Sequence, residues 1–361
     1  MVYQEIYNVQ HGMAFGALMA AFPFMTGLSA GSFTLSTFAY VFGKKEYKAI
    51  SKYAVFMALI LLGMAVSLLF IDMTQPSRSY FTMMRGNVTS MFSWSAFLVG
   101  GYMAASGIYA YSIFAHRDGV AKLMGIICIP LALAVHADTG FVFGLTKGMP
   151  IWHTSLMPFL FLISALTSGI ALIVFMVITK DTLFTKKKEN KIDRNLIFGL
   201  GNMLILLIAI EFFLDMSDVT TMIFAGAEEV EAVKLWLTGP FSFSFLVVQL
   251  GIGGVIPVFL LTLPKISRSY LGQWLAALMI IIGTLAMRLN VVLGGQTIPK
   301  TEAGLVPYTH LVGFVGYTIG QEIFVLVTLF ILGTAAYIFC ISYVPQIIEK
   351  VDAKLFGKKE A

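Results

Sequence analysis

Charge and cysteine are both scarce in this sequence of 361 residues. Only 12% of the residues are charged whereas 58% are hydrophobic, and the mean hydropathy is +0.86. A water-soluble domain cannot cover its surface with so few polar groups, so soluble enzymes and soluble binding modules are excluded. The two cysteines, Cys128 and Cys340, stand alone inside apolar runs. This excludes a disulfide framework and predicts no iron–sulfur cluster in this chain.

Histidine is scarce as well, with five residues. A haem held by two histidines needs facing side chains at one depth on two helices, and only His136 lies well inside an apolar run. We therefore expect no haem and no metal site. The sequence also lacks a nucleotide-binding loop and a zinc-protease helix. The protein is expected to carry no redox centre of its own.

The net charge of +5 does not indicate a nucleic-acid partner. The basic residues lie in short loops beside apolar runs, where they act as topology signals and meet anionic lipid headgroups. They follow the first, third, fifth, seventh and ninth apolar runs, while Glu228, Glu229 and Glu231 lie on the other side. The positive-inside rule therefore predicts an N-terminus outside and a cytoplasmic C-terminus.

Apolar runs long enough to cross a bilayer recur along the whole sequence and predict nine transmembrane helices. The expected spans are residues 13–42, 50–72, 90–114, 121–144, 151–179, 195–216, 237–263, 270–294 and 309–344. The predicted fold class is an all-α polytopic membrane protein.

A weak internal repeat relates the two halves of the sequence. LSAG at residues 28–31 matches LTSG at 166–169, and FIDM at 70–73 matches FLDM at 213–216. Short matches of small residues also arise wherever helices touch. The repeat predicts two four-helix bundles, here called the first half (1–146) and the second half (147–296). A terminal helix and a basic cytoplasmic tail (297–361) follow.

Polar residues within the spans are the most informative feature, because ionisable groups in lipid are costly and mark functional sites. On the predicted orientation they gather in the outer half of the membrane. The residues concerned are Asn8, His11, Asp72, His136, Asp138, Trp152, His153, Asp215, Asp218, Arg288, Asn290, Gln296 and His310. A one-sided cluster of this kind suits an amphipathic ligand, whose head needs donors and whose tail needs an apolar slot.

Several of these residues also have a purely structural interpretation. Asp72 can cap a helix end, and Trp152 with His153 can belong to the interfacial aromatic belt. Arg288 lies too deep for snorkelling and needs an acidic partner or a carbonyl oxygen. Asp215 is the expected partner, either in a static ion pair or in a proton route.

Three segments of the middle spans carry a recognisable pattern: HADTGFVFG at 136–144, PIWH at 150–153 and MPFLFLISALTSG at 157–169. Supporting pieces are GLSAGS at 27–32, Asp72 with QPSR at 75–78, SW at 93–94, and RLNVV at 288–292 with GGQ at 294–296. In order and placement they resemble the NrfD/polysulfide reductase membrane-subunit (PsrC-like) family over about 300 residues. A close likeness to the DsrP-type subunit of sulfur-metabolism membrane complexes is a narrower interpretation.

The resemblance implies a subunit without cofactors that binds a quinone, usually menaquinone, near the outer face of the prokaryotic cytoplasmic membrane. It implies a four-cluster ferredoxin-like iron–sulfur subunit docked there, with further cytochrome or catalytic subunits. The expected function is electron exchange between menaquinol or menaquinone and that iron–sulfur subunit. The alternatives are a secondary transporter with a midplane site, a proton-translocating subunit and a purely structural anchor.

Histidine and carboxylate suit quinone chemistry because both exchange protons near neutral pH. We expect His136 and His11 to hydrogen-bond the quinone oxygens, and Asp138 or Asp72 to relay protons outward. The predicted quinone-binding residues are Asn8, His11, His136, Trp152 and His153, and the predicted catalytic residues are His136, Asp138 and Asp72.

Overall fold

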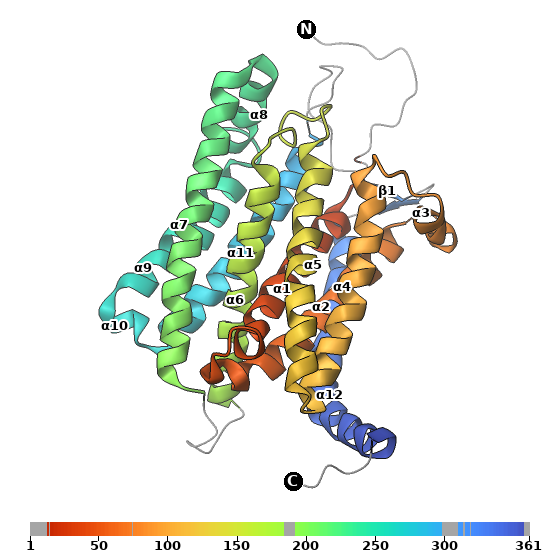
Figure 1. Ribbon diagram of the computed structural model, residues 1–361. Helices are drawn as coiled ribbons and strands as arrows, with labels where there is room; N and C mark the ends of the chain where they lie inside the picture. The colour runs from red at the N-terminus through yellow and green to blue at the C-terminus, as the bar shows by residue number, and fades with distance from the viewer. Residues whose placement is uncertain are drawn as a thin grey trace.

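The computed structural model describes residues 13, 15–73, 75–183, 192–297, 310–312, 315–317 and 319–356. Within this part, nine helices are long and apolar enough to cross a membrane. This confirms the predicted all-α polytopic class and the predicted number of spans. The helices run side by side through one elongated bundle (Figure 1).

The membrane-crossing elements follow the predicted order. They are α1 (Ala17–Tyr40), α2 (Lys48–Asp72), α4 (Met91–Phe114), α5 (Asp118–Gly144), α6 (Met157–Leu183), α7 (Arg194–Ala225), the π-helix η4 (Phe243–Val255) continued by α9 (Ile256–Thr262), α11 (Tyr270–Gly294) and α12 (Ile319–Phe356). Short elements join them: η1 (Lys45–Tyr47), η2 (Pro76–Arg78), α3 (Tyr80–Met84), α8 (Ala227–Leu237), α10 (Pro264–Ser267), and the antiparallel pair β1 (His310–Val312) and β2 (Val315–Tyr317).

Several predicted span boundaries were wrong, including the start of the seventh span, at Phe243 instead of 237, and the end of the ninth, at Phe356 instead of 344. The fifth span begins at Met157, because residues 149–156 form turns and Pro158 favours a helix start. The sixth continues to Ala225, well past the predicted end at 216. Its polar stretch does not end the helix, since the Thr220 and Thr221 hydroxyls donate to carbonyls one turn earlier. The ninth begins at Ile319, after the unpredicted hairpin β1–β2.

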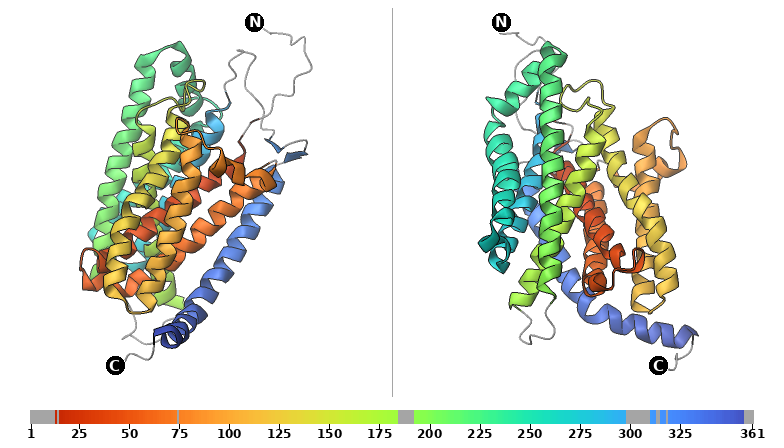
Figure 2. Two further views of the ribbon diagram at one scale, coloured as in Figure 1. Left: turned by 45° about the vertical axis from the view of Figure 1, so that its right-hand side comes forward. Right: turned by 60° about the vertical axis from the view of Figure 1, so that its left-hand side comes forward.

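Helix α1 forms the centre of the bundle. It packs against α2, α5, α6 and α11, and nearly all of its side chains are buried. In Figure 1, α4 and α5 lie on one side of it and α7, α8 and α9 on the other. Helix α12 runs along the outside beside α2, with most of its apolar side chains exposed (Figure 2). These exposed apolar side chains suit a lipid environment.

The two segments matched by the internal repeat meet where α1 crosses α6. A Cβ atom built on Gly31 would lie 2.8 Å from the Gly169 Cα, and one built on Gly169 would lie 2.4 Å from the Gly31 Cα. Equivalent residues meet in this way when two similar units are related by a twofold axis. The two halves and their boundary at residue 146 remain a prediction.

We expect Gly31→Val to destabilise the protein by about 3 kcal/mol, because the added atoms have no room against backbone on the facing helix. A Cβ there would lie 2.3 Å from the Ala165 carbonyl oxygen. The matched control is Gly63→Val on α2, where a Cβ meets no atom within 4 Å. The unfolding temperature of each variant is measured in detergent. A thiol-reactive dye that labels the buried Cys128 when the protein unfolds reports the transition. Equal unfolding temperatures for the two variants would contradict the role of the crossing.

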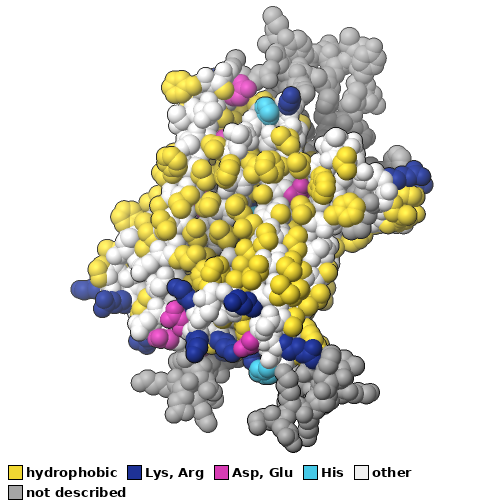
Figure 3. Space-filling model, viewed as in Figure 1, with side chains coloured by type: hydrophobic (Ala, Val, Ile, Leu, Met, Phe, Trp, Pro, Cys, Tyr) yellow, Lys and Arg dark blue, Asp and Glu magenta, His cyan; other side chains and the backbone are white. Residues whose placement is uncertain are grey.

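On the face drawn in Figure 3, most charged side chains lie away from the apolar middle of the bundle. Figure 3 shows lysines and arginines gathered mostly at one end, with an apolar belt above them. This is the end at which α1, α4, α6 and α9 finish, where the positive-inside rule expects the cytoplasm. The orientation itself remains a prediction.

Candidate functional site

His136 is fully buried on α5 and faces α1. A Cβ on Gly27 of α1 would lie 2.7 Å from the His136 Nε2 atom, so the imidazole occupies space that only glycine leaves open. Neither ring nitrogen has a hydrogen-bond partner within the described residues. A buried imidazole without a partner is costly. Both ring nitrogens therefore need a partner that the described residues do not supply.

Asp138 lies two residues further along α5 and faces α4. Its Oδ2 atom accepts a short hydrogen bond from the Ser95 hydroxyl, while Oδ1 is buried without a partner among the described residues. His136 and Asp138 therefore face different sides of α5, as residues two apart on a helix must. Asp72 is the last residue of α2 and is half-buried. The three predicted catalytic residues thus come from two helices of the first half.

Trp152 and His153 lie in the turns between α5 and α6. Trp152 is buried, and its Nε1–H donates to the Val291 carbonyl of α11 over 2.6 Å. This hydrogen bond ties the turn to α11 and uses the only donor that the indole has. His153 is exposed, with Nδ1 at 3.1 Å from the Gly144 carbonyl oxygen. Asn8 and His11 lie outside the described residues.

Arg288 does not pair with Asp215 as predicted. Its Nη2 atom donates to the Phe161 carbonyl at 3.2 Å and to the Ser164 hydroxyl, and its guanidinium lies 3.9 Å from the centroid of the Phe161 ring. Among the described residues no carboxylate lies within ion-pair distance of it. The reason is local: Ser164 and Phe161 on α6 supply nearer acceptors. Its Nε and Nη1 atoms have no partner among these residues.

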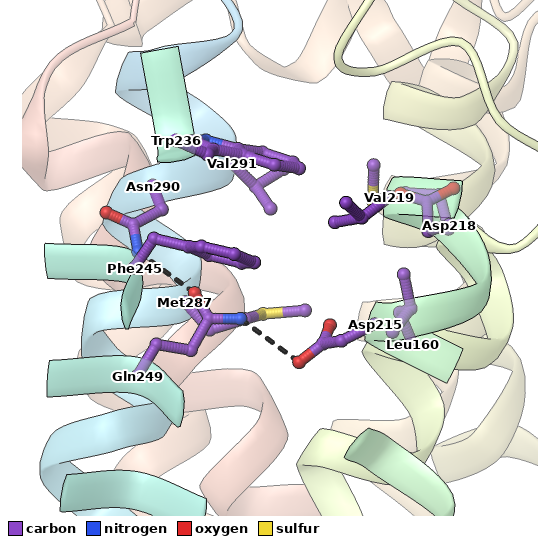
Figure 4. Close-up of a pocket in the computed structure, with 11 residues that line it drawn as sticks. Leu160, Asp215, Asp218, Val219, Trp236, Phe245, Gln249, Met287, Asn290 and Val291 are labelled. Atoms are coloured by element: carbon purple, nitrogen blue, oxygen red, sulfur yellow. Dashed lines mark hydrogen bonds between the residues drawn. The ribbon is translucent and has the colours of Figure 1, made fainter. Parts of the chain in front are cut away.

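Asp215 instead belongs to a series of amide hydrogen bonds. The Gln249 amide on η4 donates to its Oδ2 atom over 3.2 Å, and the Asn290 amide on α11 donates to the Gln249 oxygen over 2.9 Å. Figure 4 shows Gln249 between the other two side chains. Asp218, one turn along α7, accepts a hydrogen bond from the Thr154 hydroxyl over 2.6 Å. All four polar groups are buried.

Two cavities open onto this series of polar groups. The first, drawn in Figure 4, is bordered by Asp215, Asp218, Gln249 and Asn290, with Trp236 beyond them. The second lies along the α7 direction toward Glu211 and shares Asp215 and Gln249 with the first. The volume open to water is about 20 Å³ in each, which is room for one or two water molecules. Neither cavity can admit a quinone head as it stands.

Glu211 was missed in the sequence. It lies one turn before Asp215 on α7, interacts with the Thr167 hydroxyl, and is coupled electrostatically to Arg288. The signal was available, because Glu211 is a lone acid within the apolar stretch 203–214. Gln249 was missed too, since an uncharged amide in an apolar run attracts less notice.

Arg288 lies between the polar groups of the two halves. Its charge acts on Glu211 and Asp215 in the second half and on His136 in the first. Charges in a low-dielectric interior interact over longer distances than in water. Within the described residues, no three His, Cys, Asp or Glu side chains lie close enough together to hold a metal ion.

Comparison with known proteins matches most of the sequence to one family. The curated relatives include the Hdr-like menaquinol oxidoreductase integral membrane subunit of Archaeoglobus fulgidus, 29% identical over 299 residues, which cover 81% of this chain and 73% of the relative. A selenate reductase subunit of Mesobacillus selenatarsenatis is 28% identical over 331 residues, which cover 80% of this chain and 75% of the relative. A polysulfide reductase subunit of Wolinella succinogenes is 27% identical over 305 residues, which cover 77% of this chain and 93% of the relative. The family model "Polysulphide reductase, NrfD" matches residues 6–300. The protein therefore belongs to the NrfD family of polysulphide reductase membrane proteins.

Proposed function

We propose that this protein is the quinone-interacting membrane subunit of a respiratory redox complex in a prokaryotic cytoplasmic membrane. It exchanges electrons between menaquinol or menaquinone and an extracytoplasmic four-cluster iron–sulfur subunit, with its N-terminus outside and its C-terminus inside. The observation that carries the proposal is the buried His136 imidazole, whose two nitrogens have no partner within the described residues.

The relatives support this proposal from a different direction. One is a membrane subunit of a menaquinol oxidoreductase, and two others are subunits of selenate and polysulfide reductases. We infer that this protein likewise works beside an iron–sulfur subunit and further catalytic or cytochrome subunits. A subunit without its own electron carrier can pass quinol electrons on only to a partner that holds one.

The donor set at His136 fits a quinone. A quinone supplies the two-electron, two-proton chemistry when bound, and its ring oxygens need groups that both donate and accept hydrogen bonds. Neutral imidazole offers one donor and one acceptor. Asp138 has one carboxylate oxygen free of described partners and one held by Ser95, so it can take a proton while keeping its position. Asp72 at the end of α2 would relay protons toward the outer face. Asn8 and His11, the other predicted quinone-binding residues, lie outside the described residues.

We expect the purified protein to carry menaquinone, detectable by solvent extraction and chromatography, without haem absorbance. His136→Ala should lose the quinone, because the ring oxygens lose their bonding partner in a buried site. His116→Asn is the control: His116 is exposed before α5 and has a φ of 53°, which asparagine tolerates. Full quinone content in His136→Ala would remove this residue from the site. Substrate uptake by proteoliposomes without any quinone would favour the transporter alternative.

A further inference from the structure

Three acidic residues follow one another along the inner face of α7. Asp218, Asp215 and Glu211 are spaced by three and four residues, which places them on one side of the helix. Asp215 is coupled electrostatically to Glu211, Asp218 and Arg288. Carboxyl groups inside a membrane bundle are costly unless they serve a pathway or a strong partner. In the described part, none of the three has a cation at ion-pair distance.

The two water-sized cavities connect these groups in order. The first borders Asp218 and Asp215, and the second borders Asp215 and Glu211. Each can hold a water molecule that bonds the carboxyl groups on its walls. Asp215 faces both cavities, so a proton on it can leave in either direction.

The wall of the first cavity also carries a residue with an unsatisfied amide oxygen. Asn290 is 1% exposed, borders this cavity, and its Oδ1 atom has no partner among the described residues. A buried carbonyl oxygen without a donor costs free energy that a bound water would recover. The cavity therefore has a polar wall of the kind that holds water, as well as the space.

Gln249, like Asp215, lies on the wall of both cavities. Its amide hydrogen-bonds Asp215 on one side and Asn290 on the other, and its side chain borders both spaces. It projects from the π-helix η4, whose backbone comes close to α11 at Gly253 and Gly283. A Cβ on Gly283 would lie 2.2 Å from the Gly253 Cα. This close approach holds the wide helix, and Gln249 with it, against the cavities.

We propose that the second half carries a proton pathway from the α8 end of the bundle to Glu211, running through Asp218, Asp215 and water in the two cavities, with Gln249 as its internal barrier. At each step a protonated carboxyl gives its proton to a water, and that water gives one to the next carboxylate. Only O–H bonds break and form, and no electron moves. The pathway ends beside Arg288, whose positive charge stabilises the ionised Glu211 and also reaches His136.

The test follows proton exchange at Glu211 in the full-length protein reconstituted in lipid. Protons are released by a laser flash from a caged compound, and the infrared C=O band of protonated carboxyls is recorded over time. The contribution of Glu211 to this band is identified as the part that disappears in the Glu211→Gln variant. We expect Asp215→Asn and Asp218→Asn to slow the response of the Glu211 band by about tenfold or more. Asparagine has nearly the same shape as aspartate but cannot carry the proton. Gln249→Ala should speed the response by joining the cavities.

Glu231→Gln is the matched control, since Glu231 is an exposed acid on α8 at the same end of the bundle. A response in Asp215→Asn and Asp218→Asn as fast as in this control would overturn the pathway. A slower response in Gln249→Ala would overturn the barrier. A Cys128 thiol that does not react with the thiol dye shows that each variant is folded. Quinone content in the same samples separates the two proposals, because His136→Ala should lose quinone and keep fast exchange.

Discussion

Replacing His136 with alanine in the assembled complex is expected to lower quinol-driven electron transfer by about a hundredfold, which is the usual size of the loss when a group that exchanges protons with a substrate is removed. His136 is fully buried, and its ring nitrogens are free of described partners. On the proposed function, the substitution therefore removes bonds to the quinone and none to the described residues. The measurement is turnover with a soluble menaquinol analogue.

An artificial donor that reduces the iron–sulfur partner directly provides the internal control for this experiment. Its rate should be the same in the wild type and in His136→Ala, because it bypasses the membrane subunit. His136→Gln keeps hydrogen-bonding atoms but cannot carry a proton, and should recover binding more than turnover. Wild-type quinol turnover in both variants would mean that the chemistry lies elsewhere in the protein.

Arg288→Met is expected to be the most destabilising of the substitutions considered, by about 3 to 5 kcal/mol, because it removes the one cation from a buried group of charges. Arg288 donates to Phe161 and Ser164 and acts on the charges of Glu211 and Asp215. Its loss takes the guanidinium donor away from the Ser164 hydroxyl, while the Phe161 carbonyl still accepts from that hydroxyl. It also leaves Glu211 and Asp215 without their counter-charge. Thermal unfolding in detergent measures the effect.

A double-mutant cycle divides that loss into its parts. Glu211→Gln alone should cost little, since glutamine keeps the shape of the side chain and removes only its charge. If the charge interaction matters, Arg288→Met combined with Glu211→Gln should be more stable than the sum of the single effects. Arg288→Lys should lie between the wild type and Arg288→Met, because lysine keeps the charge but not the planar fork. Strict additivity would show that Arg288 acts through its hydrogen bonds alone.

The sequence predicted the architecture well because the membrane restricts the choices. With water absent, spans must be helical and about as long as the bilayer is thick, so nine apolar runs became nine helices in the described part. The ends were less certain, because threonine hydroxyls can bond back within a helix. For that reason α7 runs on to Ala225 through a polar stretch in which a helix end was predicted.

The polar residues were recognised more completely than their partners. Burial of His136 and Arg288 follows from their place in apolar runs, but the partner of a buried group depends on helix rotation and depth, which one sequence does not contain. Arg288 was assigned to Asp215 because both lie in the same predicted half. In the structure, Arg288 donates a hydrogen bond to Ser164 on α6, and Asp215 accepts one from Gln249 on η4. The π-helix that turns Gln249 inward has no local sequence signal comparable to an apolar run.

The wide turns of η4 also limit how this protein can vary. Each residue of an α-helix rotates the next by about 100°, so deleting one residue before Gln249 would tighten the helix and swing the amide toward lipid. An insertion would have the reverse effect. Changes of length should therefore be rare between Phe243 and Val255 and frequent in the exposed connections of the same bundle, so gaps in alignments of relatives would outline this helix more sharply than residue identity does.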